Sequence, residues 1–498
     1  MFVVMMGDRV KIKKLYDPHK TSERATIFDR NGVIVATDLK TKSLYVSSIL
    51  IKDPITMAES LGRIFSNLPA EEILKKITDN KGSKKTLKNW ILIKRNLAPS
   101  QVELVKSLKM AGLLFMDDSI RVYPQKSITS HFVGYVDLDR KGLSGIEMQY
   151  DKKLVNGEDI TLAMDIRVQD ILHDELLNGL EEYHAKAAAG IVMDVNSGEI
   201  LALSSLPEFD PNLQHNATPD ERFNRVTNGI YELGSVFKIF TNAAAFENNL
   251  LNLDDSYNVK DPIKYDRFTI SDDHPFRDEM NIKEIFAHSS NIGTVKIADK
   301  LGIKAQKDFL EKIGLLRKVE TEFPGLGKPI YPKTWRQINL YTISYGHGIA
   351  ITPLHLAMAV LPIVNGGTAY SPSFLKLDKR PSGAKILKES TSETMRIMLR
   401  NVVVEGTGRN ANVEGYEIGG KTGTAERAES GSYNERQTMT SFVAIFPISK
   451  PQYLAYIMFD RPNSAFNTGG MVAAPVAGKI VKNIAPLLGV RPISNEPD

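Results

Sequence analysis

The first 150 residues of the chain mix short β-type segments with amphipathic helical stretches. Apolar and β-branched residues gather at 25–27, 32–36 and 43–47, a composition typical of strands. Apolar residues at helical spacing predict helices over 71–77 and 101–108. The chain from Arg24 to about Tyr150 is therefore predicted to form an extended α+β module.

A turn signal marks the end of this module. The run Asn156-Gly-Glu-Asp159 combines residues that favour tight turns, and the strand-like stretch 160–164 follows it. We therefore predict three parts of the chain: an amino-terminal stub and stalk over 1–23, a first module over 24–155, and a larger domain over 160–490.

The larger domain begins and ends with patterns that fit a single sheet. A helix is predicted over 168–183, where leucine and isoleucine side chains share one face. The β-type stretches 190–195 and 199–204 flank Asn196-Ser-Gly198, which predicts a hairpin. Three later strands are predicted over 417–425, 439–446 and 453–459, before a closing helix over 471–488. The chain is thus predicted to be a multidomain α+β protein whose larger domain has a five-stranded antiparallel sheet flanked by helices.

Length and composition narrow the class of protein. A chain of 498 residues exceeds one ordinary core, so at least two domains are expected. Lys and Arg number 63 against 59 Asp and Glu, and the resulting charge of +4 gives no electrostatic reason to expect a nucleic acid partner. Because the chain has no cysteine, disulfides, thiolate metal sites and a cysteine nucleophile are excluded.

A candidate nucleophile stands where a helix is predicted to begin. Ser235-Val-Phe-Lys238 follows Gly234 and opens the apolar run 239–246. Residues three apart share one face of a helix, so a neutral Lys238 amine can accept the proton of Ser235 Oγ. The helix amino terminus adds unpaired N–H groups that favour an alkoxide and an oxyanion. The same spacing occurs in Pro- and Gly-rich loops at Ser373 with Lys376 and at Ser382 with Lys385.

A second motif, Ser289-Ser290-Asn291, lies at a break in a helical stretch. Its hydroxyl and amide, two residues apart, can relay a proton and hold a substrate amide. Alone, the motif is equally well explained by a helix cap or a turn.

A third motif, Lys421-Thr-Gly-Thr424, is the only K-T-G in the chain and lies in a β-type run. Gly423 leaves space for a substrate backbone beside the strand, while Lys421, Thr422 and Thr424 offer charge and hydroxyl groups to a carboxylate. Alone, it is better explained by a plain edge strand with a positive residue.

Together and in this order, the three motifs resemble the active-site signature of penicillin-binding proteins and serine β-lactamases. The likeness extends from about Arg24 to Pro486, and the first module resembles the pedestal (dimerisation) domain of class B penicillin-binding proteins. The chain departs from the family at Leu233, His347 and Ala25, where proline, an aromatic residue and glycine are common. The further similar segments are Asp194–Ala202, Phe209–Asn212, Asn224-Arg225, Ser344–Gly348, Gly406–Gly408, Asp29–Gly32, Arg121–Pro124, His131–Gly134 and Gly142–Glu147.

The resemblance implies a peptidoglycan D,D-transpeptidase with no metal or organic cofactor. Ser235 would attack the carbonyl between the terminal D-alanines of a donor stem peptide, with Lys238 as base and the N–H groups of Ser235 and Thr424 as oxyanion hole. Ser289 and Lys421 would return a proton to the leaving amine. Asn291 would hold the donor amide, and Thr422 and Thr424, beside Gly423, would bind its carboxylate. An amine acceptor stem would resolve the acyl-enzyme, and β-lactams would acylate the same serine.

Two other functions fit the same motifs. Water as acceptor would give a D,D-carboxypeptidase or a β-lactamase, although such small hydrolases seldom carry a pedestal. A scaffold that binds β-lactams without turnover is the second. A glycosyltransferase domain is not expected, because about 150 residues before the larger domain cannot house one. The stretch 224–235 is closer to septal than to elongation enzymes, so a divisome role beside a lipid II glycosyltransferase is expected.

The family works on the periplasmic face of the inner membrane, but the sequence shows no membrane anchor. The apolar run Met1-Phe-Val-Val-Met-Met6 is far shorter than the roughly 20 residues that span a membrane. We expect Met1–Met6 to be the end of a longer apolar helix. The true start codon of the reading frame would then lie upstream of Met1, and Lys or Arg would precede the helix.

Overall fold

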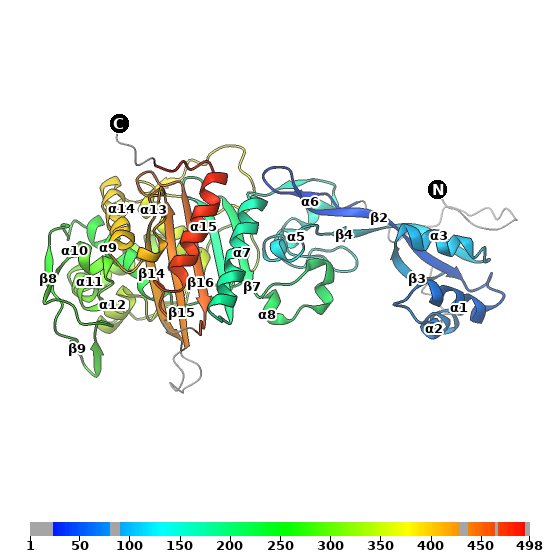
Figure 1. Cartoon of the computed structure of the whole chain (residues 1–498), viewed down its shortest axis with the longest axis horizontal. Coiled ribbons are helices and arrows are strands. Elements are labelled where there is room, and N and C mark those ends of the chain that lie inside the picture. Colours follow the sequence, from blue (N-terminus) through cyan, green and yellow to red (C-terminus); the bar gives the residue numbers. More distant parts are fainter. Residues whose placement is uncertain (1–22, 80–89, 428–436, 464–466, 494–498) are drawn as a thin grey trace.

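The computed structural model describes residues 23–79, 90–427, 437–463 and 467–493. These residues form an elongated molecule, with a large domain at one end, a small head at the other and a slender connection between them (Figure 1). The expectation for Met1–Met6 concerns residues outside those described. Within the described ranges, no helix combines the length and the apolarity that crossing a membrane requires.

The head consists of three strands and three helices. Strand β2 (Ile34–Ser47) lies between β3 (Trp90–Leu97) and β4 (Leu113–Val122), and both pairings are antiparallel. Helices α1 (Pro54–Ile64), α2 (Ala70–Asp79) and α3 (Pro99–Ser107) pack beside them. Helices α2 and α3 confirm the two predicted helices, whereas the sequence pattern did not predict α1. The head has its own hydrophobic core, which includes Leu44, Leu61 and Phe65.

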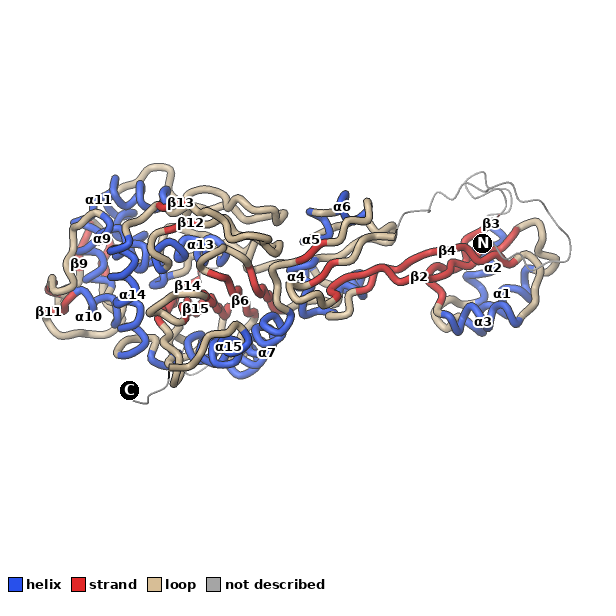
Figure 2. Tube along the Cα trace, turned by 90° about the horizontal axis from the view of Figure 1, so that it is seen from above, coloured by secondary structure: helices blue, strands red, loops and turns tan. Residues whose placement is uncertain are grey.

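The connection, called the neck below, is a two-stranded ribbon in which β2 and β4 run from the head to the rest of the molecule (Figure 2). The ladder extends from Thr37 opposite Val122 to Val46 opposite Leu113. The prediction of separate strands at 32–36 and 43–47 was wrong, because one strand covers Ile34–Ser47. The polar residues between the two stretches stay extended because their backbone groups pair with β4.

Buried ion pairs hold the base of the neck. Glu147 contacts Arg24 Nε at 2.6 Å and Arg121 Nε at 2.7 Å. Asp38 contacts Arg121 at 3.4 Å and Arg140 at 3.0 Å. None of these five side chains is more than 9% exposed. Since buried charges must be paired, this cluster fixes the ribbon on α5 (Gly145–Gln149), the helix that carries Glu147.

Short elements complete the first module. Strand β1 (Ile27–Phe28) pairs antiparallel with β2 and parallel with β5 (Ile160–Thr161), so β5 belongs to the sheet of this module. The predicted strand over 160–164 ends at Thr161, because Asp165 already caps the next helix through its bond from Arg167 N. The remaining elements are η1 (Lys126–Thr129), α4 (Ser130–Val133) and α6 (Asp151–Val155).

The larger domain contains the predicted five-stranded antiparallel sheet. The strand order is β14 (Gly419–Arg427), β15 (Gln437–Phe446), β16 (Tyr453–Asp460), β6 (Ala187–Asp194), β7 (Ile200–Leu206). The first and last helices of the domain, α7 (Ile166–Glu182) and α15 (Ala473–Leu487), pack on one face. The predicted hairpin, the three late strands and the two flanking helices are confirmed, and β14 lies at an edge of the sheet.

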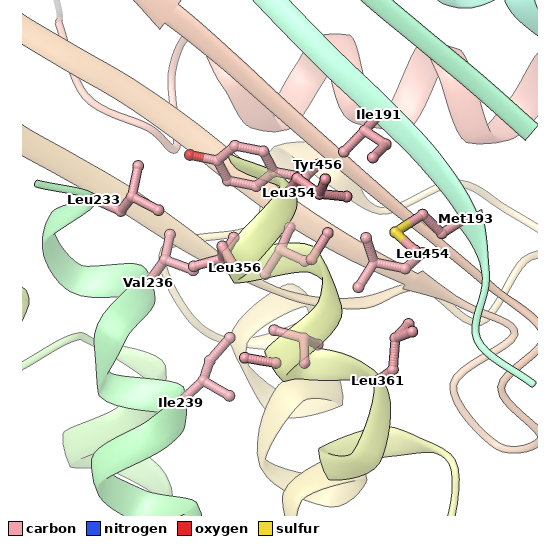
Figure 3. Close-up of a cluster of buried hydrophobic side chains, with 14 of the residues drawn as sticks. Ile191, Met193, Leu233, Val236, Ile239, Leu354, Leu356, Leu361, Leu454 and Tyr456 are labelled. Atoms are coloured by element: carbon pink, nitrogen blue, oxygen red, sulfur yellow. The ribbon is translucent and has the colours of Figure 1, made fainter. Parts of the chain in front are cut away.

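The other face of the sheet supports the helix that follows the candidate nucleophile. Ile191 and Met193 of β6 point toward this side, where α9 (Lys238–Glu247) and α13 (Pro353–Val364) pack (Figure 3). Val192, between them, points to α7 and α15, as the alternation of a strand requires. Val236 and Ile239 join this core, which seats the start of α9 against the sheet.

The long insert between β7 and β14 is mainly helical, as predicted. Its main helices are α10 (Ile282–Ala287), α11 (Asn291–Lys312), α12 (Gln337–Ser344) and α14 (Glu389–Val404). Its short elements are η2 (Pro211–Asn216), α8 (Pro219–Arg222), η3 (Gly234–Phe237), β8 (Ser256–Asn258), β9 (Ile263–Tyr265), β10 (Phe268–Ile270), β11 (Glu279–Asn281), β12 (Thr368–Ala369), β13 (Ala384–Lys385) and η4 (Arg409–Ala411).

Candidate active site

Ser235 lies in a single 3-10 turn, η3, that leads into α9. The sequence predicted a helix that begins at Ser235, but the α-helix begins at Lys238. Because side chains three apart eclipse in a 3-10 turn, Ser235 and Lys238 still share one face. Gly234 has φ of 58°, and a Cβ there would lie 2.3 Å from Thr424 O. Only glycine therefore allows this turn to lie against β14.

Lys238 is fully buried and reaches the second motif. Its Nζ donates to the carbonyl of Ser289, to Ser289 Oγ at 3.0 Å and to Asn291 Oδ1 at 2.7 Å. Burial lowers the pKa of the Lys238 amine from 10.5 to about 7, against the opposing effect of Asp272 and Asp273. An amine with this pKa can lose its proton near neutral pH, as a general base must.

The second motif is held in place by the loop that carries Ser271 and Asp272. Ser289 has φ of 64°, a conformation that few side-chain-bearing residues adopt. Asn291 Nδ2 donates to Ser271 O at 3.0 Å, which turns its oxygen toward Lys238. Asp272 accepts from Ser290 Oγ at 2.7 Å, from Ile292 N at 3.0 Å and from Asn291 N. A carboxylate here also complements the positive amino terminus of α11.

The third motif brings a second buried lysine to the same serine. Lys421 Nζ donates to Ser289 Oγ at 3.0 Å, so Ser289 lies between two lysine amines. Burial first, and then the charge of Lys238, hold the pKa of Lys421 well below its usual range. Two adjacent amines that share one hydroxyl can pass a proton through it.

The threonines and the glycine of this motif lie along β14. Thr422 Oγ1 bonds Thr407 Oγ1 at 2.7 Å, and Thr424 Oγ1 accepts from Gly469 N at 3.0 Å. A Cβ on Gly423 would lie 2.6 Å from Val236 Cγ2. The glycine therefore lets the strand approach the nucleophile turn, and its role beside a substrate stays a prediction.

Residues of all three motifs line one cavity of about 250 Å³, to which Ser235, Ser289, Thr422 and Thr424 contribute. Lys238 and Lys421 lie behind it, fully buried. No role was predicted for the other lining residues, which come from loops, from the carboxyl end of α10 and from η4. These further lining residues are Asp273, His274, Phe276, His288, Thr407, Arg409, Asn410, Thr468, Gly470 and Met471.

The two competing S-x-x-K copies lie elsewhere. Ser373 Oγ donates to Glu322 Oε1 at 2.9 Å, and no helix begins between Ser373 and Lys385. Neither Ser373 nor Ser382 lines the cavity of Ser235. Geometry therefore separates Ser235 from both alternatives.

Comparison with known proteins decides the family. Residues 188–482 match the model of the penicillin binding protein transpeptidase domain, and residues 19–161 match that of the penicillin-binding protein dimerisation domain. The chain belongs to the class B penicillin-binding proteins. The family assignment also confirms the predicted enzyme class, a serine-type transpeptidase.

Relatives of the family match over most of their length. The probable peptidoglycan D,D-transpeptidase FtsI of Caulobacter vibrioides is 35% identical, over 94% of this chain and 82% of the relative. Stage V sporulation protein D of Bacillus subtilis is 32% identical, over 95% and 80%. A peptidoglycan synthetase structure from Bifidobacterium adolescentis shares the fold, with a TM-score of 0.76 at 20% identity over 96% of this chain and 97% of that one.

No group of three or more His, Asp and Glu side chains in the described ranges could hold a metal ion. The cavity instead offers hydroxyls, amines and an amide, which suit acyl transfer.

Proposed function

We propose that this class B penicillin-binding protein cross-links peptidoglycan through an acyl-enzyme on Ser235. The observation that carries the proposal is the convergence of the three motifs on one cavity, with both lysine amines bonded to Ser289 behind it. The match of residues 188–482 to the transpeptidase domain, which spans all three motifs, supports the same conclusion.

In the acylation step, Lys238 Nζ takes the proton of Ser235 Oγ as the oxygen attacks the carbonyl between the two terminal D-alanines. The N–H groups of Ser235 and Thr424 stabilise the oxyanion. The C–N bond then breaks, and the proton passes from Lys238 through Ser289 to the leaving D-alanine. Asn291 holds the donor amide, while Thr422, Thr424 and the charge of Lys421 bind its carboxylate.

In the second step, the side-chain amine of an acceptor stem attacks the ester, releases Ser235 and forms the new peptide bond. Water in the same place would give a carboxypeptidase instead. Product analysis with a donor stem peptide separates the two: a cross-linked dimer is expected when acceptor is present, and a shortened monomer alone would overturn transpeptidation.

The β-lactams should acylate the same serine as mimics of the donor. Labelling with a fluorescent penicillin, followed by mapping of the modified peptide, tests this directly. Ser235→Ala should abolish the label, whereas the control variants Ser373→Ala and Ser382→Ala should keep it. Label that persists on the Ser235→Ala variant would refute the proposed nucleophile.

We further propose that the enzyme works at the septum, on the periplasmic face of the inner membrane, together with divisome membrane proteins that include a lipid II glycosyltransferase. Relatives named FtsI support this assignment. Depletion of the protein in cells should produce filaments with unfinished septa. Rounded or bulging cells would assign it to elongation instead.

A further inference from the structure

Beside a shared hydrophobic core, part of the contact between the first module and the larger domain is made by side-chain amides of the larger domain, which donate to backbone carbonyls of the first. Asn212 Nδ2 donates to Tyr123 O at 2.9 Å, and Gln214 Nε2 donates to Val136 O at 2.8 Å. Farther along, Asn224 Nδ2 donates to His131 O at 3.0 Å. The segment 209–224 therefore ties the larger domain to residues 123–136 of the first module.

Asn224 differs from the other amides because it also shapes the chain that leads to the nucleophile. Its Oδ1 accepts from Val226 N at 3.0 Å and from Thr227 N at 3.2 Å. Its carbonyl accepts from Asn228 N at 2.9 Å. The side chain of Asn224 thus bonds the first module through Nδ2 and the segment that leads to Ser235 through Oδ1.

The chain from Asn224 to Ser235 offers little freedom to absorb a displacement. Val226 O accepts from Leu354 N at 3.2 Å, and Thr227 O accepts from Gly327 N at 2.9 Å. Tyr231 exchanges two backbone bonds with Ile351, each of 2.9 Å. The segment up to the nucleophile turn is therefore held at successive points of the larger domain, and its course at the first of these points depends on how Asn224 shapes the turn at Val226 and Thr227.

The bond of Asn224 is not supported by close packing on all sides. Asn224 and His131 both line a cavity of about 340 Å³ between the two parts of the chain, which Phe223 and Met148 also line. Asn224 is nevertheless buried, with 7% of its surface exposed. The ring of His131 also packs edge-on against Phe209, so hydrogen bonds and aromatic packing together fix the junction at this point.

We propose that Asn224 is a positioning residue that couples the first module to the placement of Ser235. This inference rests on the proposed function. The bond from Asn224 to His131 O sets the position of the turn at Val226 and Thr227. The position of this turn then sets the alignment of Ser235 against β14. A change in the first module that moves residue 131 would then alter the acylation rate without changing any residue that lines the cavity of Ser235.

The test is Asn224→Ser, compared with Asn212→Ser as a matched control. A serine at 224 can still accept from the N–H groups of Val226 and Thr227, but it cannot reach His131 O. A serine at 212 loses the equivalent bond to Tyr123 O in the same contact. The acylation rate constant of the full chain by a fluorescent penicillin, the fraction of protein that reacts, and the thermal unfolding are measured for each.

Asn224→Ser should lower the rate constant by roughly ten- to a hundredfold, as misplacement of a reacting group does, while Asn212→Ser stays within about twofold of wild type. A merely structural role would reduce the reacting fraction and leave the rate constant of that fraction unchanged. Asn224→Asp, assayed at pH 8, also lacks the N–H donor to His131 O, and its acylation should be equally slow. This variant replaces Asn224→Ser in the test if the serine variant does not fold.

Equal rate constants in the two serine variants would overturn the coupling but leave the acyl-enzyme intact. A wild-type protein that is not acylated at Ser235 would overturn the proposed function and this inference together.

Discussion

At the residue scale, the pKa of Lys238 makes the reaction depend on pH. In the proposed mechanism the neutral Lys238 amine is the base, and the fraction of neutral amine rises with pH through its pKa of about 7. The acylation rate constant should therefore rise about tenfold per pH unit between roughly pH 5 and 6.5 and level off above pH 8. Stopped-flow measurement with a fluorescent penicillin gives this profile.

The control for this profile is Lys238→Arg. A guanidinium stays protonated over the whole range, so this variant should be nearly inactive at every pH. A rate that is flat from pH 5 to 8 in the wild type would show that Lys238 is not the base.

Individual motif residues could be predicted from the sequence because each motif is a short run whose side chains meet through local geometry. Ser235 and Lys238 were distinguished from the two other pairs of the same spacing by the apolar helical run that follows them. Other lining residues, such as Asp273, Phe276 and Thr468, could not be predicted, because they come from segments that are far apart in the sequence and meet only in the folded domain. The predicted role of Gly423 was also incomplete, since a Cβ there would meet Ser441 of β15 and Val236 of the nucleophile turn.

At the element scale, the amino terminus of α11 depends on one carboxylate outside the motifs. Asp272→Ala removes bonds to Ser290 Oγ and to the N–H groups of Asn291 and Ile292. We expect a loss of about 1–2 kcal/mol in unfolding free energy, as for a lost cap, and a slower acylation, because the partners of Lys238 move with the helix. Denaturant unfolding and penicillin labelling measure the two effects.

Asp53→Ala is the matched control. Asp53 caps α1 in the head and accepts from Ile55 N at 3.0 Å and Thr56 N at 3.2 Å, far from the cavity. It should cost a similar free energy and leave the acylation rate unchanged. If both variants slow acylation equally, the position of α11 is not what matters.

The five sheet strands and the two flanking helices of the larger domain were predictable because each has an apolar pattern that ends at a turn, whereas the short strands of the insert were not predicted. The neck was not, because its ribbon reverses the usual pattern. The side chains of Asp38 and Arg121 are buried. Leu39 and Ile120, opposite each other in the ladder, are 50% and 39% exposed. A pattern rule that places apolar residues inside therefore fails where ion pairs form the contact.

At the scale of the whole molecule, the ion cluster at the base of the neck should be a point of strong sensitivity. Glu147→Ala leaves Arg24 and Arg121 without their shared partner in a buried site. We expect a loss of about 3–5 kcal/mol in the stability of the first module, visible by calorimetry. Asp117→Ala, which breaks an exposed pair with Lys42, should cost less than about 1 kcal/mol. Similar losses in both would mean that burial of the cluster contributes nothing.

The covalent path of the neck has a consequence for how the head can move. The chain enters the head along β2 and leaves it along β4, so two covalent backbones join the head to the base side by side. Tension along the long axis is carried by both backbones together and does not require the ladder between them to separate. A ladder of this length spans about 30 Å. The neck therefore keeps the head at a constant distance from the larger domain. A force on the head can tilt or turn it, but cannot draw it away.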